Sequence, residues 1–216
     1  MTTKLNYRGE AKDLVNSLHN GLMSTKYIIA FTESKLYDFV NESRFNSDII
    51  ISNGKSIQLS KNLKDYMFFD EDIIQQYNYN LLCVHIFSSL EQFLKGICSL
   101  LKYKSVCEES KKSSLGRYTD IIKYNYPDLD ISKIYKKLDN WRLIRNSIVH
   151  NKCILKKNIA IKVSSIVDID WTLEPDEISF IIRAYHLVEY LDLIKEFSIL
   201  ICKNIFKDFD NSIYSL

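Results

Sequence analysis

Three side chains suited to acid–base and phosphate chemistry stand close together in the sequence, namely Arg145, Asn146 and His150. An imidazole exchanges a proton near neutral pH, so His150 is suited to general acid–base chemistry. The planar guanidinium of Arg145 presents a fork of N–H donors that matches phosphate oxygens. Asn146 and His150 are four residues apart, which makes them neighbours on a helix. The segment is therefore suited to proton transfer beside a bound phosphate.

The spacing of Arg145 and His150 limits how they can act together. They are five residues apart, which is about 140° around an ideal helix, so they do not share one face. Three arrangements would bring them together. The Arg145 side chain could bend around the helix, the helix could end near His150, or a second subunit could complete the site. Asn151 suits a helix end at this point.

Two opposite charges fall on apolar helix faces. A helix over 132–150 places Arg145 on its apolar stripe, between Trp141 and Ile148. A guanidinium on a packed face is costly unless it is paired or faces a ligand. On the preceding long helix, Glu91 lies among apolar residues in the same way. We predict that Glu91 meets Arg145 and orients its guanidinium; the alternative is that both side chains point to water at the edges of the helices.

The pattern Arg145-Asn146-x-x-x-His150 resembles the Arg-polar-x3-His motif of the HEPN superfamily, in which the residue after Arg is commonly Asn, Asp or His. The segment 87–97, Phe-Ser-Ser-Leu-Glu-Gln-Phe-Leu-Lys-Gly-Ile, also looks like the second helix of that family. The motif lies late in the chain and one long helix follows it, as in the family's bundle. The resemblance covers roughly residues 75–205.

The resemblance implies a metal-independent endoribonuclease, often a toxin or a phage-defence effector, that acts as a homodimer with both motifs in one cleft. The RNA 2′-OH would attack the phosphate and leave a 2′,3′-cyclic phosphate and a 5′-OH. His150 would act as base or acid, and Arg145 would hold the scissile phosphate. Asn146 would position a phosphate oxygen or His150, with Glu91 in support. Lys152 stands where one subgroup has Tyr, so the tyrosine-modified toxin type is not supported.

The expected partners are an RNA substrate, a second copy of the chain, and a cognate antitoxin or sensor protein. Arg142 and Lys152 are candidates for contact with the RNA backbone. Because the chain has many lysines, a solvated cluster explains Lys152 equally well. The alternative function is a non-catalytic HEPN-like helical module that binds a partner protein or a nucleotide. An unrelated helical dimer with an incidental motif is a third possibility. His85 and His186 are interpreted as partnered histidines of apolar helices.

The elements that must position these residues are predicted to be mainly helical. Periodic apolar residues and helix-start signals predict an all-α, up-down bundle of four to five helices in a single domain, 1–216. The expected helices cover 10–43, 72–104, 118–125, 132–150 and 176 to about 207. The last of them would carry Pro175 in its first turn.

Two β insertions are expected between the helices. Asn53-Gly54 stands between two β-rich runs, and both residues tolerate the positive φ of a hairpin turn, so we predict a hairpin over 48–59. The segment 154–174 is expected to be irregular or to form a second hairpin, because 159–163 and 165–167 are β-prone runs.

Composition excludes several classes of protein. With 46% apolar residues the chain can bury a core, and with 5 Gly and 2 Pro it has too few turns for a repetitive all-β fold. The net charge of +2 gives no strong attraction to nucleic acid or membranes, so RNA capture would depend on a local site. Arg142 and Arg145, two of only six arginines, fall in one turn of one helix.

Sequence features also bear on the compartment. The first residues lack the apolar core of a signal peptide, and no run approaches the roughly 20 uncharged apolar residues of a membrane helix. The five cysteines are scattered, without a CxxC pair or a Cys–His pair at zinc-ligand spacing. We therefore expect a cytoplasmic protein with reduced, mostly buried thiols, no metal site or other cofactor, and no membrane partner.

Overall fold

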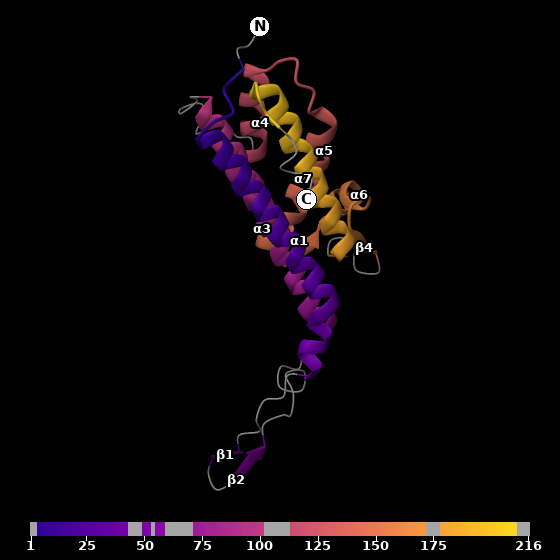
Figure 1. Cartoon of the computed structure of the whole chain (residues 1–216). Coiled ribbons are helices and arrows are strands. Elements are labelled where there is room, and N and C mark those ends of the chain that lie inside the picture. Colours follow the sequence, from indigo (N-terminus) through magenta and orange to yellow (C-terminus); the bar gives the residue numbers. More distant parts are fainter. Residues whose placement is uncertain are drawn as a thin grey trace.

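The computed structural model describes residues 4–42, 49–52, 55–58, 71–101, 113–171 and 178–210. The chain is mainly helical, which confirms the predicted class (Figure 1). The helices are α1 (Glu10–Glu42), α3 (Glu71–Leu100), α4 (Ser114–Asn125), α5 (Ser132–His150), α6 (Lys157–Val163) and α7 (Ala184–Ile205). The strands are β1 (Ile49–Ser52), β2 (Lys55–Gln58), β3 (Ile154–Leu155), β4 (Asp168–Asp170) and β5 (Ile178–Ile181).

The two longest helices, α1 and α3, run side by side in opposite directions (Figure 1). The Leu14 side chain of α1 packs directly over Gly96 of α3, since a Cβ atom on Gly96 would lie 2.6 Å from Leu14 Cδ1. Gly21 faces Ser89 further along, where the corresponding distance to the Ser89 Oγ is 3.8 Å. The missing side chain at Gly96 therefore lets α1 pack tightly on α3.

Helices α3, α5 and α7 share the buried core that supports the motif. Phe87 and Leu90 of α3 are buried, as is Trp141 of α5. The Trp141 ring stacks on the Tyr190 ring of α7, with centroids 4.2 Å apart and planes 7° apart. This aromatic pair fixes α5 against α7, since stacked rings add attraction beyond their buried area.

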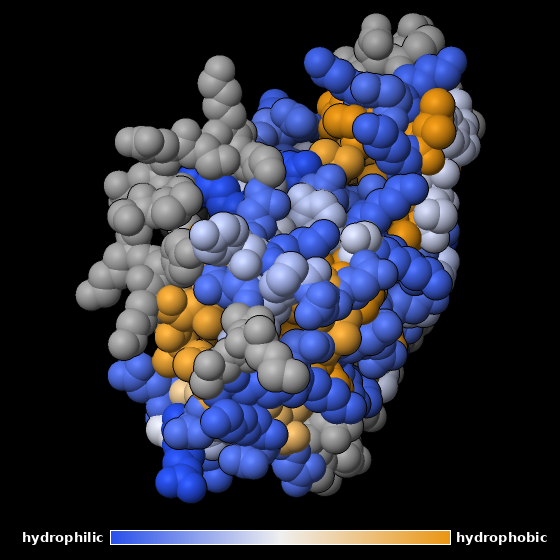
Figure 2. Space-filling model, turned by 90° about the horizontal axis from the view of Figure 1, so that it is seen from above, coloured by the Kyte–Doolittle hydropathy of each residue, from blue (hydrophilic) through white to orange (hydrophobic). Residues whose placement is uncertain are grey.

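Helix α3 is long and apolar enough over 75–100 to cross a membrane by length and composition. Half of the 18-residue window that meets this criterion is buried inside the structure. Four cysteines lie in the described part of the chain; none of them forms a disulfide and three are buried, as expected, while Cys107 lies outside the described residues. On the face shown in Figure 2, hydrophobic residues form separated groups among hydrophilic ones, which is usual for a protein surface.

The hairpin predicted over 48–59 is confirmed. Strands β1 and β2 are antiparallel, with Ile49 opposite Gln58 and Ser52 opposite Lys55. This register leaves two residues between the strands, the length of connection that the Asn-Gly signal predicts. The turn residues themselves lie outside the described part of the chain.

The segment after α5 differs from the prediction. β5 lies between β3 and β4 and pairs with both in antiparallel fashion, so the segment 154–174 supplies two strands of a three-stranded sheet rather than a hairpin of its own. The run 159–163, predicted as β-prone, lies in α6, because Ala160 and Val163 are buried one helical turn apart. The burial of one face of this short helix stabilises it more than the β propensity of its residues favours a strand.

The last helix begins later than predicted. We expected it from 176, but Ile178–Ile181 is strand β5 and α7 begins at Ala184. In β5 the buried residues, Ile178 and Phe180, alternate with less buried ones, which is the period of a strand. Pro175 lies outside the described residues. The strand was not predicted because the apolar residues of this segment also fit a helical pattern, and its pairing with β3 and β4 cannot be read from the segment itself.

Helix α4 also differs in extent from the expected helix over 118–125, because it begins at Ser114. The Ser113 hydroxyl accepts a hydrogen bond from the Gly116 N–H at 3.3 Å and so caps the helix. Helix α3 ends at Leu100, four residues before the predicted end.

The N-terminal segment pairs with the end of α7. The Leu5 N–H donates to the Ile205 carbonyl at 2.8 Å, and the Lys207 N–H donates to the Leu5 carbonyl at 2.9 Å. Leu5 and Phe206 thus form a parallel β-bridge. Nearby, the Tyr7 ring packs against the Phe206 ring with centroids 5.5 Å apart.

Candidate functional site

Helix α5 carries the Arg145-to-His150 motif and has the bounds that the sequence predicted, Ser132–His150. Asn151 caps its end, and the Asn151 N–H donates to the Ser147 carbonyl. The next two residues, Lys152 and Cys153, have φ values of 51° and 64°, in the left-handed region that favours glycine. The chain therefore turns sharply directly after His150.

Arg145 is half-buried and lies against α3. Its Cζ atom is 5.9 Å from the centre of the Phe87 ring, and its Nη1 donates to the Asn146 Oδ1 at 3.1 Å. The buried Nε atom has no hydrogen-bond partner in the structure. A buried donor without a partner costs stability. The guanidinium is therefore held in place, but its Nε–H group lacks a hydrogen-bond acceptor.

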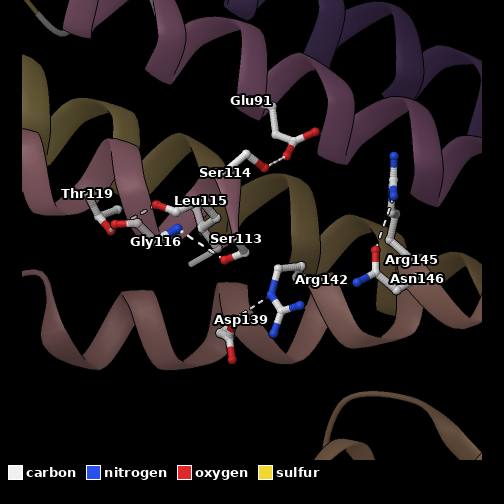
Figure 3. Close-up of polar contacts among 10 residues, drawn as sticks. All are labelled: Glu91, Ser113, Ser114, Leu115, Gly116, Thr119, Asp139, Arg142, Arg145 and Asn146. Atoms are coloured by element: carbon white, nitrogen blue, oxygen red, sulfur yellow. Dashed lines mark hydrogen bonds and ion pairs between the residues drawn. The ribbon is translucent and has the colours of Figure 1, made fainter. Parts of the chain in front are cut away.

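The predicted contact between Glu91 and Arg145 is wrong. The Glu91 carboxylate accepts a hydrogen bond from the Ser114 hydroxyl, and among the described contacts there is no ion pair between Glu91 and Arg145. Figure 3 shows the Glu91 side chain turned toward Ser114 and the Arg145 side chain beside Asn146. The physical reason is that α4 begins earlier than the sequence indicated and places a hydroxyl donor beside Glu91. The alternative is not borne out either, because both charged side chains are half-buried.

His150 is exposed at the last position of α5. Within the described part of the chain its side chain makes no hydrogen bond with Arg145 or Asn146. Of the three motif residues, one chain thus brings together Arg145 and Asn146 and leaves the imidazole accessible. The first of the three expected arrangements, in which the Arg145 side chain bends around the helix to reach His150, is therefore not observed.

The two candidate RNA-binding residues lie apart. Arg142 forms an ion pair with Asp139, with Nε and Oδ1 2.6 Å apart, and lines a groove of about 650 Å³ between α4 and α5. Lys123 and Asp120 of α4 and Asp139 of α5 also line the groove, so its charges are mixed. Lys152 is exposed in the turn after His150.

Sequence reasoning missed a polar cluster around Asp168 of β4. Its carboxylate accepts from the Arg183 Nε at 2.6 Å and from the Tyr185 hydroxyl at 3.2 Å, and lies 3.7 Å from the His186 Nε2. The Nδ1 of His186 accepts from the Arg183 N–H at 3.0 Å. His186 is therefore partnered, as predicted, whereas His85 is exposed and that prediction is wrong. The cluster ties β4 to the start of α7.

The Asp168 cluster shifts the pKa values of its members. The hydrogen bond from Arg183 is the main reason that the pKa of Asp168 lies below its usual value. Burial lowers the pKa of His186, against the opposing effect of the Asp168 charge. With its Nδ1 accepting a hydrogen bond, His186 is held in the neutral form that points Nε2–H toward Asp168.

The substitution Asp168→Asn is expected to lower the free energy of unfolding at pH 7 by about 0.5–1 kcal/mol, since the cluster is partly exposed to solvent. A carboxyl whose pKa is lowered by folding stabilises the folded state above its unfolded pKa, and this stabilisation is lost as the pH falls through the folded pKa. Urea unfolding should therefore show the difference between parent and variant shrinking below about pH 4. Asp128→Asn, at an exposed position, is the control; a difference that stays constant with pH would contradict this role for Asp168.

No family model, curated protein or solved structure matches the chain. Among the residues that the structure describes, no group of three or more His, Cys, Asp or Glu side chains could hold a metal ion.

Proposed function

We propose that the chain is a metal-independent endoribonuclease of the HEPN type. The observation that carries the proposal is the arrangement on α5: Arg145 is held by Asn146 and by Phe87, and an exposed His150 follows five residues later at the helix end. A cation fixed for phosphate oxygens and an accessible imidazole are the two groups that RNA cleavage through the 2′-OH requires.

The unpaired donors of Arg145 support a role in anion binding. Its Nη1 donates to Asn146, while its buried Nε and its Nη2 donate to no residue in the described part of the chain. A phosphate oxygen would supply the missing acceptor, and charge-assisted hydrogen bonds of this kind are among the stronger ones in proteins. A purely structural arginine would be expected to have found such a partner within the fold.

In the proposed reaction the 2′-oxygen attacks phosphorus and the bond from phosphorus to the 5′-oxygen breaks. The 2′-OH proton passes to a neutral imidazole, and the leaving 5′-oxygen takes a proton from an imidazolium. His150 fills one of these two roles. Arg145 stabilises the charge that builds on the non-bridging oxygens. The products carry a 2′,3′-cyclic phosphate and a 5′-OH, with no net change in protons.

The proposal includes a homodimer with the site at its cleft. One chain leaves His150 at the helix end, apart from Arg145, so a second copy of α5 would supply the missing group. Val149, next to His150, is 46% exposed and gives the helix end an apolar side chain that a second subunit would cover. We further propose one HEPN-type helical bundle over 1–216, a cytoplasmic location, and a toxin or abortive-infection role restrained by an antitoxin or sensor protein.

The test is incubation of the purified chain with total RNA and with tRNA in EDTA. Cleavage is expected to persist without divalent ions, because the proposed groups are an imidazole and a guanidinium. The upstream fragments should resist labelling at the 3′ end until acid opens the cyclic phosphate and a phosphatase removes the resulting monophosphate. Cleavage that EDTA abolishes, or fragments that begin with a 5′-phosphate, would show that this mechanism is wrong.

The second candidate function is a non-catalytic HEPN-like module that binds a partner protein or a nucleotide. It is favoured by the packing of Arg145 on Phe87, and by the lack of a hydrogen bond between Arg145 and His150 in the described part of the chain. The EDTA assay separates the two, since the module would leave every RNA intact.

A further inference from the structure

A pocket of about 700 Å³ lies between α1, α3 and the start of α7. We call it the tyrosine pocket and define it by Gln76, Tyr77 and Asn80 of α3 together with Arg183 and Tyr185 at the start of α7. Its volume is within the range of small-molecule and cofactor sites. Neither the motif nor the proposed mechanism accounts for it.

The tyrosine pocket adjoins the end of the motif helix. The Asn80 Nδ2 donates to the Cys153 Sγ at 3.3 Å, and Cys153 belongs to the sharp turn that directly follows His150. Strand β3, which leaves that turn, pairs with β5, whose last residue, Ile181, also lines the pocket. A strand of RNA with a phosphate at His150 would therefore pass close to the pocket.

Two exposed aromatic rings line the pocket from different elements. Tyr185 is 52% exposed, yet its ring is held by the hydrogen bond of its hydroxyl to Asp168 and by the His186 ring, whose centre is 4.0 Å away. Tyr77 on α3 is 64% exposed. Exposed tyrosine rings offer faces on which any unpaired base can stack, and a ring that is already fixed loses little freedom on binding.

The charges of the pocket are largely compensated. Glu33 accepts hydrogen bonds from the Gln75 amide and the Tyr79 hydroxyl, and Arg183 is bonded to Asp168. A neutral heterocycle fits such a lining better than a phosphate does. Gln76 donates its amide N–H to the Asn80 Oδ1 at 3.0 Å, which leaves the Gln76 carbonyl oxygen to accept from a base N–H.

We infer that the tyrosine pocket binds an unpaired base of single-stranded RNA next to the phosphate held at the motif. The inference rests on the proposed ribonuclease function and adds a substrate class, namely single strands or loops rather than duplex. A base inside a duplex keeps its faces stacked on its neighbours, so it cannot enter the pocket.

The test measures binding by fluorescence anisotropy in a His150→Ala background, with a labelled single-stranded RNA of mixed sequence and the same strand in a duplex. Tyr185→Ala is expected to weaken single-strand binding about tenfold, from the usual value of one base–aromatic stack. Tyr185→Phe loses the bond to Asp168 but keeps the ring, so its affinity should stay near that of the parent. Tyr124→Ala removes a 77% exposed tyrosine on α4 and serves as the control.

Unchanged single-strand affinity in Tyr185→Ala, equal losses in Tyr185→Ala and Tyr185→Phe, or tighter binding of duplex would each overturn the inference. Adenosine monophosphate is the competitor that distinguishes a free nucleotide from an RNA base. If it displaced the RNA at concentrations far below those of a matching dinucleotide, the inference of an RNA-base site would also be overturned.

The outcomes separate the two proposals. Loss of binding in Tyr185→Ala without any cleavage by the parent would refute the ribonuclease alone, and cleavage with unchanged binding would refute the pocket alone.

Discussion

The substitution His150→Ala is expected to abolish RNA cleavage while the fold and the oligomeric state persist. General acid–base catalysis by a positioned side chain contributes about 10²- to 10⁴-fold, so the residual rate should fall below the background of the assay. The side chain is exposed and makes no hydrogen bond in the described part of the chain, so little stability depends on it. Gel assays of tRNA cleavage, thermal unfolding and light scattering measure the three quantities.

The matched control is His85→Ala, because His85 is also an exposed histidine on a long helix. This variant should cleave RNA at the parental rate. Full activity in His150→Ala would refute the mechanism, and equal losses in the two variants would indicate a general effect on the protein rather than loss of a catalytic group.

The substitution Arg145→Met is expected to lower the cleavage rate at least about 100-fold without lowering the melting temperature. Removal of one donor to a developing oxyanion commonly costs that much. The folded state would lose a buried Nε that has no partner, and an unbranched thioether can fill the space beside Phe87. The hydrogen bond to Asn146 and the contact of the guanidinium with the Phe87 ring would be lost, and the thioether would replace the second of these with a sulfur–aromatic contact. Loss of activity with stability kept or raised is the signature of a residue retained for function.

Arg142→Met provides the comparison, because Arg142 lies one turn earlier and is paired with Asp139. It is expected to change the cleavage rate by less than about tenfold, as for a peripheral contact to the RNA backbone. A large drop in melting temperature in Arg145→Met, with unchanged cleavage, would assign Arg145 to the scaffold and favour the non-catalytic module.

Local signals explain which parts of the fold could be predicted. Helix α5 was predicted with its observed bounds because the apolar stripe around Trp141 and the Asn at its end agree with one another. The β1–β2 hairpin was predicted from Asn53-Gly54, since the turn depends on two adjacent residues. Signals of this kind depend only on residues that are close together in the sequence.

Contacts between separate secondary-structure elements explain what could not be predicted. Strand β5 exists because β3 and β4 pair with it, and a helical pattern of apolar residues over 176–207 conceals it. Glu91 bonds to Ser114 because a helix starts there, beyond a segment that the sequence indicates to be a loop. The position of a side chain on a helix follows from its periodicity, but its partner depends on what packs against that helix.

The same division holds for the candidate site. The helical periodicity placed Arg145 on the inner face of α5 and His150 on another side. In the structure Arg145 is half-buried and His150 is exposed, in agreement with both placements. The Asp168 cluster joins a strand to the start of a helix, so no pattern within one segment pointed to it. The tyrosine pocket is likewise formed by residues from three separate helices and β5.

The bridge between Leu5 and Phe206 has a consequence for the order in which the chain folds. Near it, Lys4 donates a hydrogen bond to the carbonyl of Lys203, 199 residues away. The entropic cost of closing a loop grows with its length, and contacts between distant segments form slowly. The bridge should therefore form after the helices have packed, and it should be able to open while the helices stay packed. In hydrogen exchange, the Leu5 and Lys207 amides would lose protection in a local opening while the amides of α3 and α7 exchange only with global unfolding.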